Sequence, residues 1–338
     1  MDSMLLSIII PVYNVAQYIV KCVDSIINQE IKGKYEIILV ENGSSDDSYE
    51  VVESLSMRYP DIVRLIRIDI PDVSKARNIG IDCAKGKYVT FIDGDDWIEP
   101  TMFGALLDIA QSYDADIVES NYFLNVPGKE LRIIGDSLCL NEGKVYVKNG
   151  LQAMADILLE KCTSSPCGRI YLRKFLGKEC RFPEGVFYED HACIYRWSSL
   201  AEKVVHLDKA FYHYEIRPGS TTGITQKSRK KAADFFNAEF DRIAFVSGNE
   251  LMDAATKKEV IRHITHRCIH IFGKVCIVAY GADNIYNPEM LSLRSKLLDM
   301  LNLPWSLIRY EDRIRLLRIK YGWRGYAMKK MRKSECGR

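Results

Sequence analysis

The first 124 residues alternate short apolar runs with stretches that have one apolar helical face. Residues 5–10 form an almost unbroken apolar run that ends at Pro11, as is typical of a strand buried on both faces of a parallel sheet. A helical stretch follows over about 16–28. This alternation predicts an α/β fold with a mostly parallel sheet flanked by helices, which binds its ligands at the carboxyl ends of the strands.

The expected elements continue along the whole chain. We expect strands over 36–40, 62–68, 87–92 and 116–124, with helices over 46–59, 74–84 and 100–113. The pattern is less regular from 126 to 225, where we expect a hairpin over 130–147, helices over 150–161 and 166–176, and strands over 204–214. From 225 onward the pattern is helical, with breaks at Asn287-Pro288 and Leu303-Pro304.

Composition limits the class of protein. A hydrophobic fraction of 47% and a charged fraction of 27% are ordinary for a folded chain. No apolar run approaches the roughly 18 residues that span a bilayer. The 10 cysteines form no Cys-x-x-Cys pair and no signal peptide is evident, so we expect a reducing, cytoplasmic location. The net charge of +2 is not that of a nucleic-acid binder.

Positive charge is concentrated at the end of the chain. Residues 305–338 contain eleven basic and three acidic residues, a local net of +8, which leaves −6 for the remainder of the +2 total. Apolar residues, including Trp305 and Trp323, are interspersed with the basic ones. Two interpretations stay open: a basic amphipathic helix on an anionic membrane, and a helix packed on the catalytic domain with a solvated basic face.

Three carboxylates follow the expected strand 87–92. Asp93 and Asp95 are two residues apart in Asp93-Gly94-Asp95-Asp96, so both can face one ligand. Crowded carboxylates favour a bound cation, and oxygen ligands favour Mg²⁺ or Mn²⁺. Such an ion would neutralise charge on a departing diphosphate. The alternative is an acidic turn in which Asp95 or Asp96 caps the next helix.

Two later segments add candidate chemistry. Glu189-Asp190 precedes a helical pattern and could supply a general base, although helix capping by Asp190 is an equal alternative. The segment 217–223 carries Arg217 and several hydroxyls, and could close over a diphosphate or be a plain surface turn.

Taken together, these segments resemble the family 2 inverting glycosyltransferases of the GT-A fold and the bacterial surface-polysaccharide type. Four motifs occur in the family's order over roughly residues 5–225: 7–14, 36–46, 75–88 and the acidic turn. The resemblance implies a GT-A catalytic domain over 1–225, with a nucleotide-binding half (1–124) and an acceptor-binding half (125–225). A helical region with a basic amphipathic tail would follow over 226–338.

The resemblance also implies roles for individual residues. Uracil would contact Pro11, Tyr13 and Glu41, although the family often has two aspartates where this chain has Glu41-Asn42. The donor would also contact Arg77 and Asp93, and a loop with Arg217 and Ser220 would cover its diphosphate. Asp95 would be the principal metal ligand, His213 a further ligand, and Asp190 the catalytic base.

The expected activity is a metal-dependent hexosyl or N-acetylhexosaminyl transfer. A UDP-sugar donor, with Mn²⁺ or Mg²⁺, would glycosylate a hydroxyl of a glycan or lipid-linked glycan with inversion, in capsular, exopolysaccharide or other cell-surface glycan synthesis. The protein would be cytoplasmic, with the inner face of the cell membrane as a peripheral site. The alternative is a catalytically inactive nucleotide-sugar-binding subunit of a glycan-assembly complex.

Overall fold

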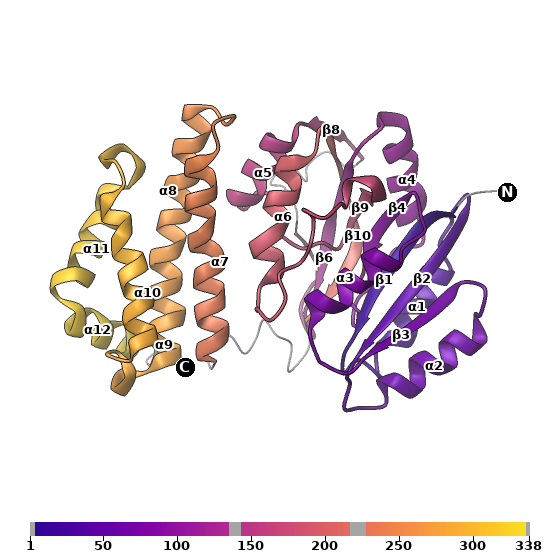
Figure 1. The fold of residues 1–338 in the computed structure, drawn as a ribbon, viewed down its shortest axis with the longest axis horizontal. Helices are drawn as coiled ribbons and strands as arrows, with labels where there is room; N and C mark the ends of the chain where they lie inside the picture. The colour runs from indigo at the N-terminus through magenta and orange to yellow at the C-terminus, as the bar shows by residue number, and fades with distance from the viewer. Residues whose placement is uncertain (1–3, 135–142, 217–227, 336–338) are drawn as a thin grey trace. The chain divides into compact units, whose positions relative to one another are not determined.

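The computed structural model describes residues 4–134, 143–216 and 228–335 (Figure 1). Its described residues form two compact units. The sheet unit takes its residues from Met1–Ile157, Lys161–Gly185 and Cys193–Arg217. The helical unit takes its residues from Leu158–Glu160, Val186–Ala192 and Pro218–Arg338. A short segment around residue 190 therefore groups with the carboxyl-terminal helices.

One mixed sheet forms the core of the sheet unit (Figure 1). The strand order is β3-β2-β1-β4-β9-β6-β10-β5, with β7 on β6 and β8 on β10. The strands are β1 (Met4–Val12), β2 (Lys34–Asn42), β3 (Val63–Ile68), β4 (Tyr88–Phe91), β5 (Trp97–Ile98), β6 (Ile117–Asn125), β7 (Arg132–Ile134), β8 (Val145–Lys148), β9 (Arg169–Leu172) and β10 (Val204–Glu215). The first four strands in this order are parallel, whereas β9 is antiparallel to β4 and β6.

Helices connect these strands and flank the sheet, which confirms the predicted α/β architecture. They are α1 (Ile19–Ile27), α2 (Ser48–Arg58), α3 (Val73–Cys83), α4 (Met102–Tyr113), α5 (Gly150–Leu158) and α6 (Glu189–Leu200). Right-handed crossovers place α1 and α2 on one face of the sheet and α3 on the other. Because β2, β1 and β4 are adjacent and parallel, the loops after all three begin at one edge of the sheet.

Two predicted elements are wrong. Residues 166–176 contain strand β9 and a 3₁₀ turn (Arg173–Phe175) in place of a helix. Arg169 is buried in that strand and paired with Glu119 at 3.0 Å, so a polar residue occupies a core position that the apolar pattern cannot reveal. The expected hairpin over 130–147 is also absent from its described part, because β7 pairs with β6 and β8 with β10.

The helical unit is built on the antiparallel pair α7 and α8 (Figure 1). Its helices are α7 (Arg229–Gly248), α8 (Ala254–Ile271), α9 (Ile277–Tyr280), α10 (Pro288–Asp299), α11 (Tyr310–Tyr321) and α12 (Trp323–Glu335), and a π-helical turn (Phe272–Cys276) joins α8 to α9. Both predicted breaks are confirmed. Asn287 caps α10 with Pro288 in its first turn, and Pro304 separates α10 from α11.

The basic tail packs its apolar side within the helical unit. Ile308, Leu316, Ile319 and Trp323 are buried there. Most of the basic side chains remain exposed, namely Arg309, Arg318, Lys320, Arg324, Lys329, Arg332 and Lys333. In the part of the chain that the structure describes, no helix is both long and apolar enough to cross a bilayer.

Candidate active site

The loops after β1 and β2 are joined by hydrogen bonds. Asn14, in the left-handed conformation with φ 51°, accepts a bond from the Ser45 amide at 2.8 Å, and its own amide donates to Ser44 Oγ at 3.2 Å. Pro11 and Val12 are the last residues of β1 and are both buried, and Tyr13 is 45% exposed just beyond them. The structure thus brings Pro11 and Tyr13 to the strand edge beside the loop after β2, where an aromatic face is available to a planar ligand.

Glu41 lies at the same edge but is turned into the protein. Its side chain is 1% exposed, and Oε1 accepts a hydrogen bond from the Ser44 amide at 2.6 Å. Oε2 is buried without a hydrogen-bond partner and lies 3.5 Å from Nε of Arg67. These contacts give Glu41 a part in shaping the turn after β2, and its predicted contact with uracil stays a prediction.

The acidic turn directly follows β4, at the edge shared with β1. Asp93 and Asp95 are half-buried, and Asp96 is buried. A Cβ at Gly94 would lie 3.3 Å from the Pro11 carbonyl oxygen and 3.1 Å from Val15 Cγ2, so glycine permits this close approach to the end of β1. Neither Asp95 nor Asp96 caps α4, because the residue before that helix is Thr101.

Tyr212 of β10 holds the acidic turn in place. Its hydroxyl accepts a hydrogen bond from the Asp93 amide at 3.1 Å and donates to Oδ2 of Asp96 at 2.5 Å. Burial, with the charges of Asp95 and Asp93, raises the pKa of Asp96 well above its usual range. Burial is the larger cause of this raised pKa, and the two neighbouring carboxylates add to it.

Arg77, on α3, faces Asp93 from within the protein. Its Nη2 lies 2.8 Å from Asp93 Oδ1, and its guanidinium stacks over the Phe182 ring at 5.1 Å. The Arg77 side chain is 5% exposed and that of Asp93 is 32% exposed, so the pair fixes a carboxylate that solvent can still reach. Two residues predicted to contact the donor are therefore brought together.

His213 is held on both ring nitrogens and both ring faces. Nε2 lies 2.8 Å from Glu99 Oε1, and Nδ1 is 3.3 Å from the side-chain nitrogen Nδ2 of Asn125. The ring stacks on Trp97 at 3.5 Å and on Phe123 at 4.6 Å. Burial lowers its pKa, which favours the neutral form. This arrangement favours a structural role, because a metal would have to displace the contact with Glu99 or Asn125; the predicted ligand role stays untested.

Asp190 lies in the first turn of α6, within the segment that belongs to the helical unit. Its Oδ1 accepts a hydrogen bond from the His191 amide at 2.8 Å, and the side chain is half-buried. Tyr188, just before the helix, is in the left-handed conformation with φ 62°. The two loop residues predicted to cover a diphosphate, Arg217 and Ser220, lie outside the described residues.

The oxygen donors at the acidic turn fit a magnesium or manganese ion. Asp93 and Asp95 offer carboxylates beside the buried Asp96, and a divalent cation would relieve their mutual repulsion. Over residues 4–134, 143–216 and 228–335, no three His, Cys, Asp or Glu side chains are grouped to hold a metal by themselves. Mg²⁺ commonly takes one or two protein carboxylates and completes its shell with water and substrate phosphate.

Several residues that shape this edge were missed from the sequence. Tyr212 stands next to His213, but nothing in the local pattern links its hydroxyl to residues more than a hundred positions earlier. Asn42 accepts a hydrogen bond from the Asp72 amide at 2.8 Å, and Asp72 caps α3, the helix that carries Arg77. No local pattern signals that contact, because Asn42 and Asp72 are 30 residues apart.

The fold is that of a GT-A transferase. The chain is similar to a solved structure of Staphylococcus aureus TarS, residues 1–349, in complex with UDP-GlcNAc, with a TM-score of 0.68 and 19% sequence identity. The match covers 99% of this chain and 93% of that one. At this identity the likeness shows the fold alone.

Sequence comparison places the chain within a family. The family model described as Glycosyl transferase family 2 matches residues 7–196, so the chain belongs to that family of glycosyltransferases. It is 31% identical over 222 residues to glycosyltransferase GlyG of Streptococcus pneumoniae serotype 4, covering 64% of this chain and 73% of GlyG. It is 35% identical over 229 residues to GlyA of the same organism, covering 65% of this chain but 32% of GlyA.

Proposed function

We propose that this chain transfers a hexosyl or N-acetylhexosaminyl group from a UDP-sugar to a hydroxyl of an acceptor glycan, with inversion at the anomeric carbon. The observation that carries the proposal is the acidic turn Asp93–Asp96, placed at the shared edge of β1, β2 and β4 with Arg77 on Asp93. UDP-GlcNAc is the ligand named for the TarS complex, and the two share this fold.

Each part of the strand edge has a proposed task. Tyr13 and the Asn14-linked loops would receive the nucleoside, with Pro11 and Glu41 beneath it. Arg77 would hold Asp93 in one orientation toward the donor ribose. Asp95, with Asp93 beside it, would be the principal ligand of Mn²⁺ or Mg²⁺, which when bound supplies neutralising charge for the departing diphosphate. Asp190 would accept the proton from the attacking hydroxyl.

Inversion follows from a single displacement. One base and one stabilised leaving group suffice for direct attack on the anomeric carbon, without a covalent intermediate on the protein. We place the reaction in the synthesis of a capsular, exopolysaccharide or other cell-surface glycan, on a free or lipid-linked acceptor. TarS, GlyG and GlyA support this only by being similar proteins.

The test is UDP release by the purified chain with Mn²⁺ and a panel of UDP-hexoses and UDP-N-acetylhexosamines. Asp190→Asn should bind UDP as the parent does but lose about 10²–10⁴-fold in transfer, because it removes the proton acceptor. Glu189→Gln, at the neighbouring carboxylate, is the matched control and should stay active. Full transfer by Asp190→Asn refutes the base. Normal UDP binding with no release from any donor would instead indicate an inactive binding subunit.

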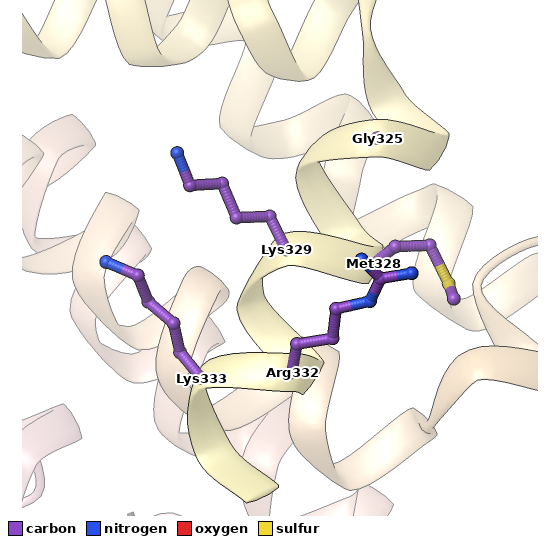
Figure 2. A pocket seen from close by; sticks show the side chains of 5 residues that line it. All are labelled: Gly325, Met328, Lys329, Arg332 and Lys333. Atoms are coloured by element: carbon purple, nitrogen blue, oxygen red, sulfur yellow. The ribbon is translucent and has the colours of Figure 1, made fainter. Parts of the chain in front are cut away.

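We also propose that the basic surface of α12 contacts an anionic lipid surface. A hollow of about 520 Å³ on this helix is lined by Gly325, Met328, Lys329, Arg332 and Lys333 (Figure 2). Figure 2 shows Lys329 and Lys333 extending in one direction and Arg332 with Met328 in another. Burial, with the nearby charges of Arg315 and Lys274, lowers the pKa of Lys330, as expected where positive charges crowd. Such a surface favours a polyanionic partner.

A further inference from the structure

Helix α7 makes a row of contacts with the segment that carries Asp190. The ring of Tyr188 stacks on Phe235 with 4.5 Å between centroids. Nδ1 of His191 lies 2.9 Å from Oε1 of Glu239. The spacing of Phe235, Glu239 and Arg242 by four and three residues puts all three on one face of the helix. Tyr188 and His191, which flank Glu189-Asp190, thus both contact α7.

Arg242 donates two hydrogen bonds to the backbone next to Asp190. Its Nε and Nη2 donate to the carbonyl oxygen of His191 at 3.1 and 2.8 Å. A guanidinium provides two donors in fixed geometry, so this contact orients the peptide as well as binding it. About two turns earlier on α7, Asp234 Oδ2 accepts a hydrogen bond from the Phe187 amide at 3.0 Å. The backbone is therefore held just before α6, at Phe187, and within its first turn, at His191.

The supporting residues are themselves fixed by buried charge. Glu239 is fully buried, and Arg242 is 1% exposed. Glu239 receives Arg242 Nη1 at 2.9 Å and Arg267 Nε, from α8, at 3.0 Å. Breaking a buried pair leaves an uncompensated charge, so the cluster resists rearrangement. Because this cluster is rigid, α7 and α8 give residues 187–191 a fixed support.

The backbone of Tyr188 is strained where it contacts α7. A φ of 62° is unfavourable for a residue with a bulky side chain, and it persists only where surrounding contacts impose it. The stack on Phe235 and the hydrogen bond from the Phe187 amide to Asp234 are such contacts. The strained turn sets the direction in which α6 begins, and with it the position of Asp190.

We infer that α7 positions Asp190 for proton transfer, so that the helical carboxyl-terminal unit takes part in catalysis. Phe235, Glu239 and Arg242 are positioning residues that act through the 187–191 segment. This inference rests on the proposed function, in which Asp190 is the base. A base must lie within hydrogen-bond reach of the hydroxyl it deprotonates, and a displacement of about 1 Å can cost roughly 10²-fold in rate.

The experiment compares Phe235→Leu and Arg242→Lys with the parent. Phe235→Leu removes the ring stack but keeps an apolar side chain, and Arg242→Lys keeps a charge beside Glu239 but loses the paired grip on the His191 carbonyl. We expect kcat for transfer to fall roughly 10- to 100-fold. The Kd for UDP with Mn²⁺, measured by calorimetry, should be unchanged. Phe235→Tyr should restore kcat.

Two controls separate positioning from a general effect on the fold. Lys296→Met removes a 2.7 Å hydrogen bond to Asn237, also on α7, without touching residues 187–191, and should keep full kcat. Combining Phe235→Leu with Asp190→Asn should cost nothing beyond Asp190→Asn alone, since both act on one step.

The outcomes separate this inference from the proposed function. If Asp190→Asn is inactive while Phe235→Leu and Arg242→Lys keep full kcat, the inference alone is overturned. The same holds if Phe235→Leu costs as much in the Asp190→Asn background as in the parent. Full transfer by Asp190→Asn overturns the base assignment and the inference together.

Discussion

At the scale of single residues, the acidic turn shows how one hydroxyl can link the backbone of one aspartate to the carboxyl of another. Tyr212 joins the Asp93 amide to the Asp96 carboxyl, while Arg77 takes Asp93 Oδ1. Both carboxyl oxygens of Asp96 accept hydrogen bonds within the protein, Oδ2 from Tyr212 and Oδ1 from the Glu215 amide at 2.9 Å. Of the three acids, Asp93 and Asp95 are therefore the two with half-buried side chains that a donor and its metal can share.

Asp95 gives the first prediction at this scale. Asp95→Ala removes an oxygen ligand from a pair of which the other member, Asp93, is already engaged by Arg77. We expect the Mn²⁺-dependent part of UDP affinity to fall at least 10- to 100-fold, roughly the loss seen when even the supports of a metal ligand are changed. Calorimetry with Mn²⁺ and with EDTA measures this part. Asp61→Ala, at an exposed acid, is the control, and an unchanged Mn²⁺ effect in Asp95→Ala would rule out the ligand role.

At the scale of elements, helices and strands could be predicted from the sequence where one face or both faces are apolar. Strands β1 and β2 are continuous buried runs, and their positions could be predicted to within a few residues. Strand β9 could not, because its buried Arg169 looks like a surface residue until Glu119 is placed beside it. Motif spacing could likewise predict that Asp93 and Asp95 lie at a strand end, since that depends on local sequence alone.

The contacts of the Asp190 segment could not be predicted from the sequence. His191 and Glu239 are 48 residues apart, and Tyr188 and Phe235 meet through a backbone conformation that a tyrosine rarely adopts. No periodicity links the two segments, because each interaction joins one residue of a short turn to one face of a distant helix. Sequence reading could place Asp190 at a helix start, but not the helix that supports it.

The buried carboxyl of Glu239, on α7, should make the stability of the fold depend on pH in acid. Burial opposes ionisation of Glu239, but Arg242 and His191 outweigh it and lower the pKa of this carboxyl below its ordinary value of about 4.3. The unfolded chain then binds more protons than the folded one below that pH. The stabilisation is complete above about pH 4.3 and is lost as the pH falls through the depressed value.

Substituting this carboxyl tests the response. Glu239→Gln should lower the free energy of unfolding at neutral pH, because Arg242 and Arg267 lose a buried partner, and should flatten its decline in acid. Urea unfolding between about pH 6 and about pH 3 measures both effects. Glu259→Gln, exposed on α8, should leave the curve as in the parent. If the free energy of unfolding falls as steeply in acid for Glu239→Gln as for the parent, Glu239 is not the source of the pH dependence.

At the scale of the whole molecule, the family-matched region and the compact units have different boundaries. The family match ends at residue 196, inside α6, whereas residues 186–192 group with the helices that follow residue 217. The family's sequence signature therefore includes a segment whose packing partners lie outside it. In this chain, the end of the family-matched region is therefore supported by helices that follow it in the sequence.

The surface of α12 supplies the last prediction. Each exposed lysine near an anionic bilayer contributes about 1 kcal/mol, so Lys329→Gln with Lys333→Gln should weaken binding by about 2 kcal/mol, or roughly 30-fold. Sedimentation with vesicles rich in phosphatidylserine at low salt measures the change, and neutral vesicles should not bind. Lys32→Gln with Lys34→Gln removes equal charge from exposed positions in the sheet unit and should bind as the parent does. Because the attraction is screened by salt, binding of the parent that persists at 1 M salt, or an equal loss in both double variants, would exclude α12 as the contact.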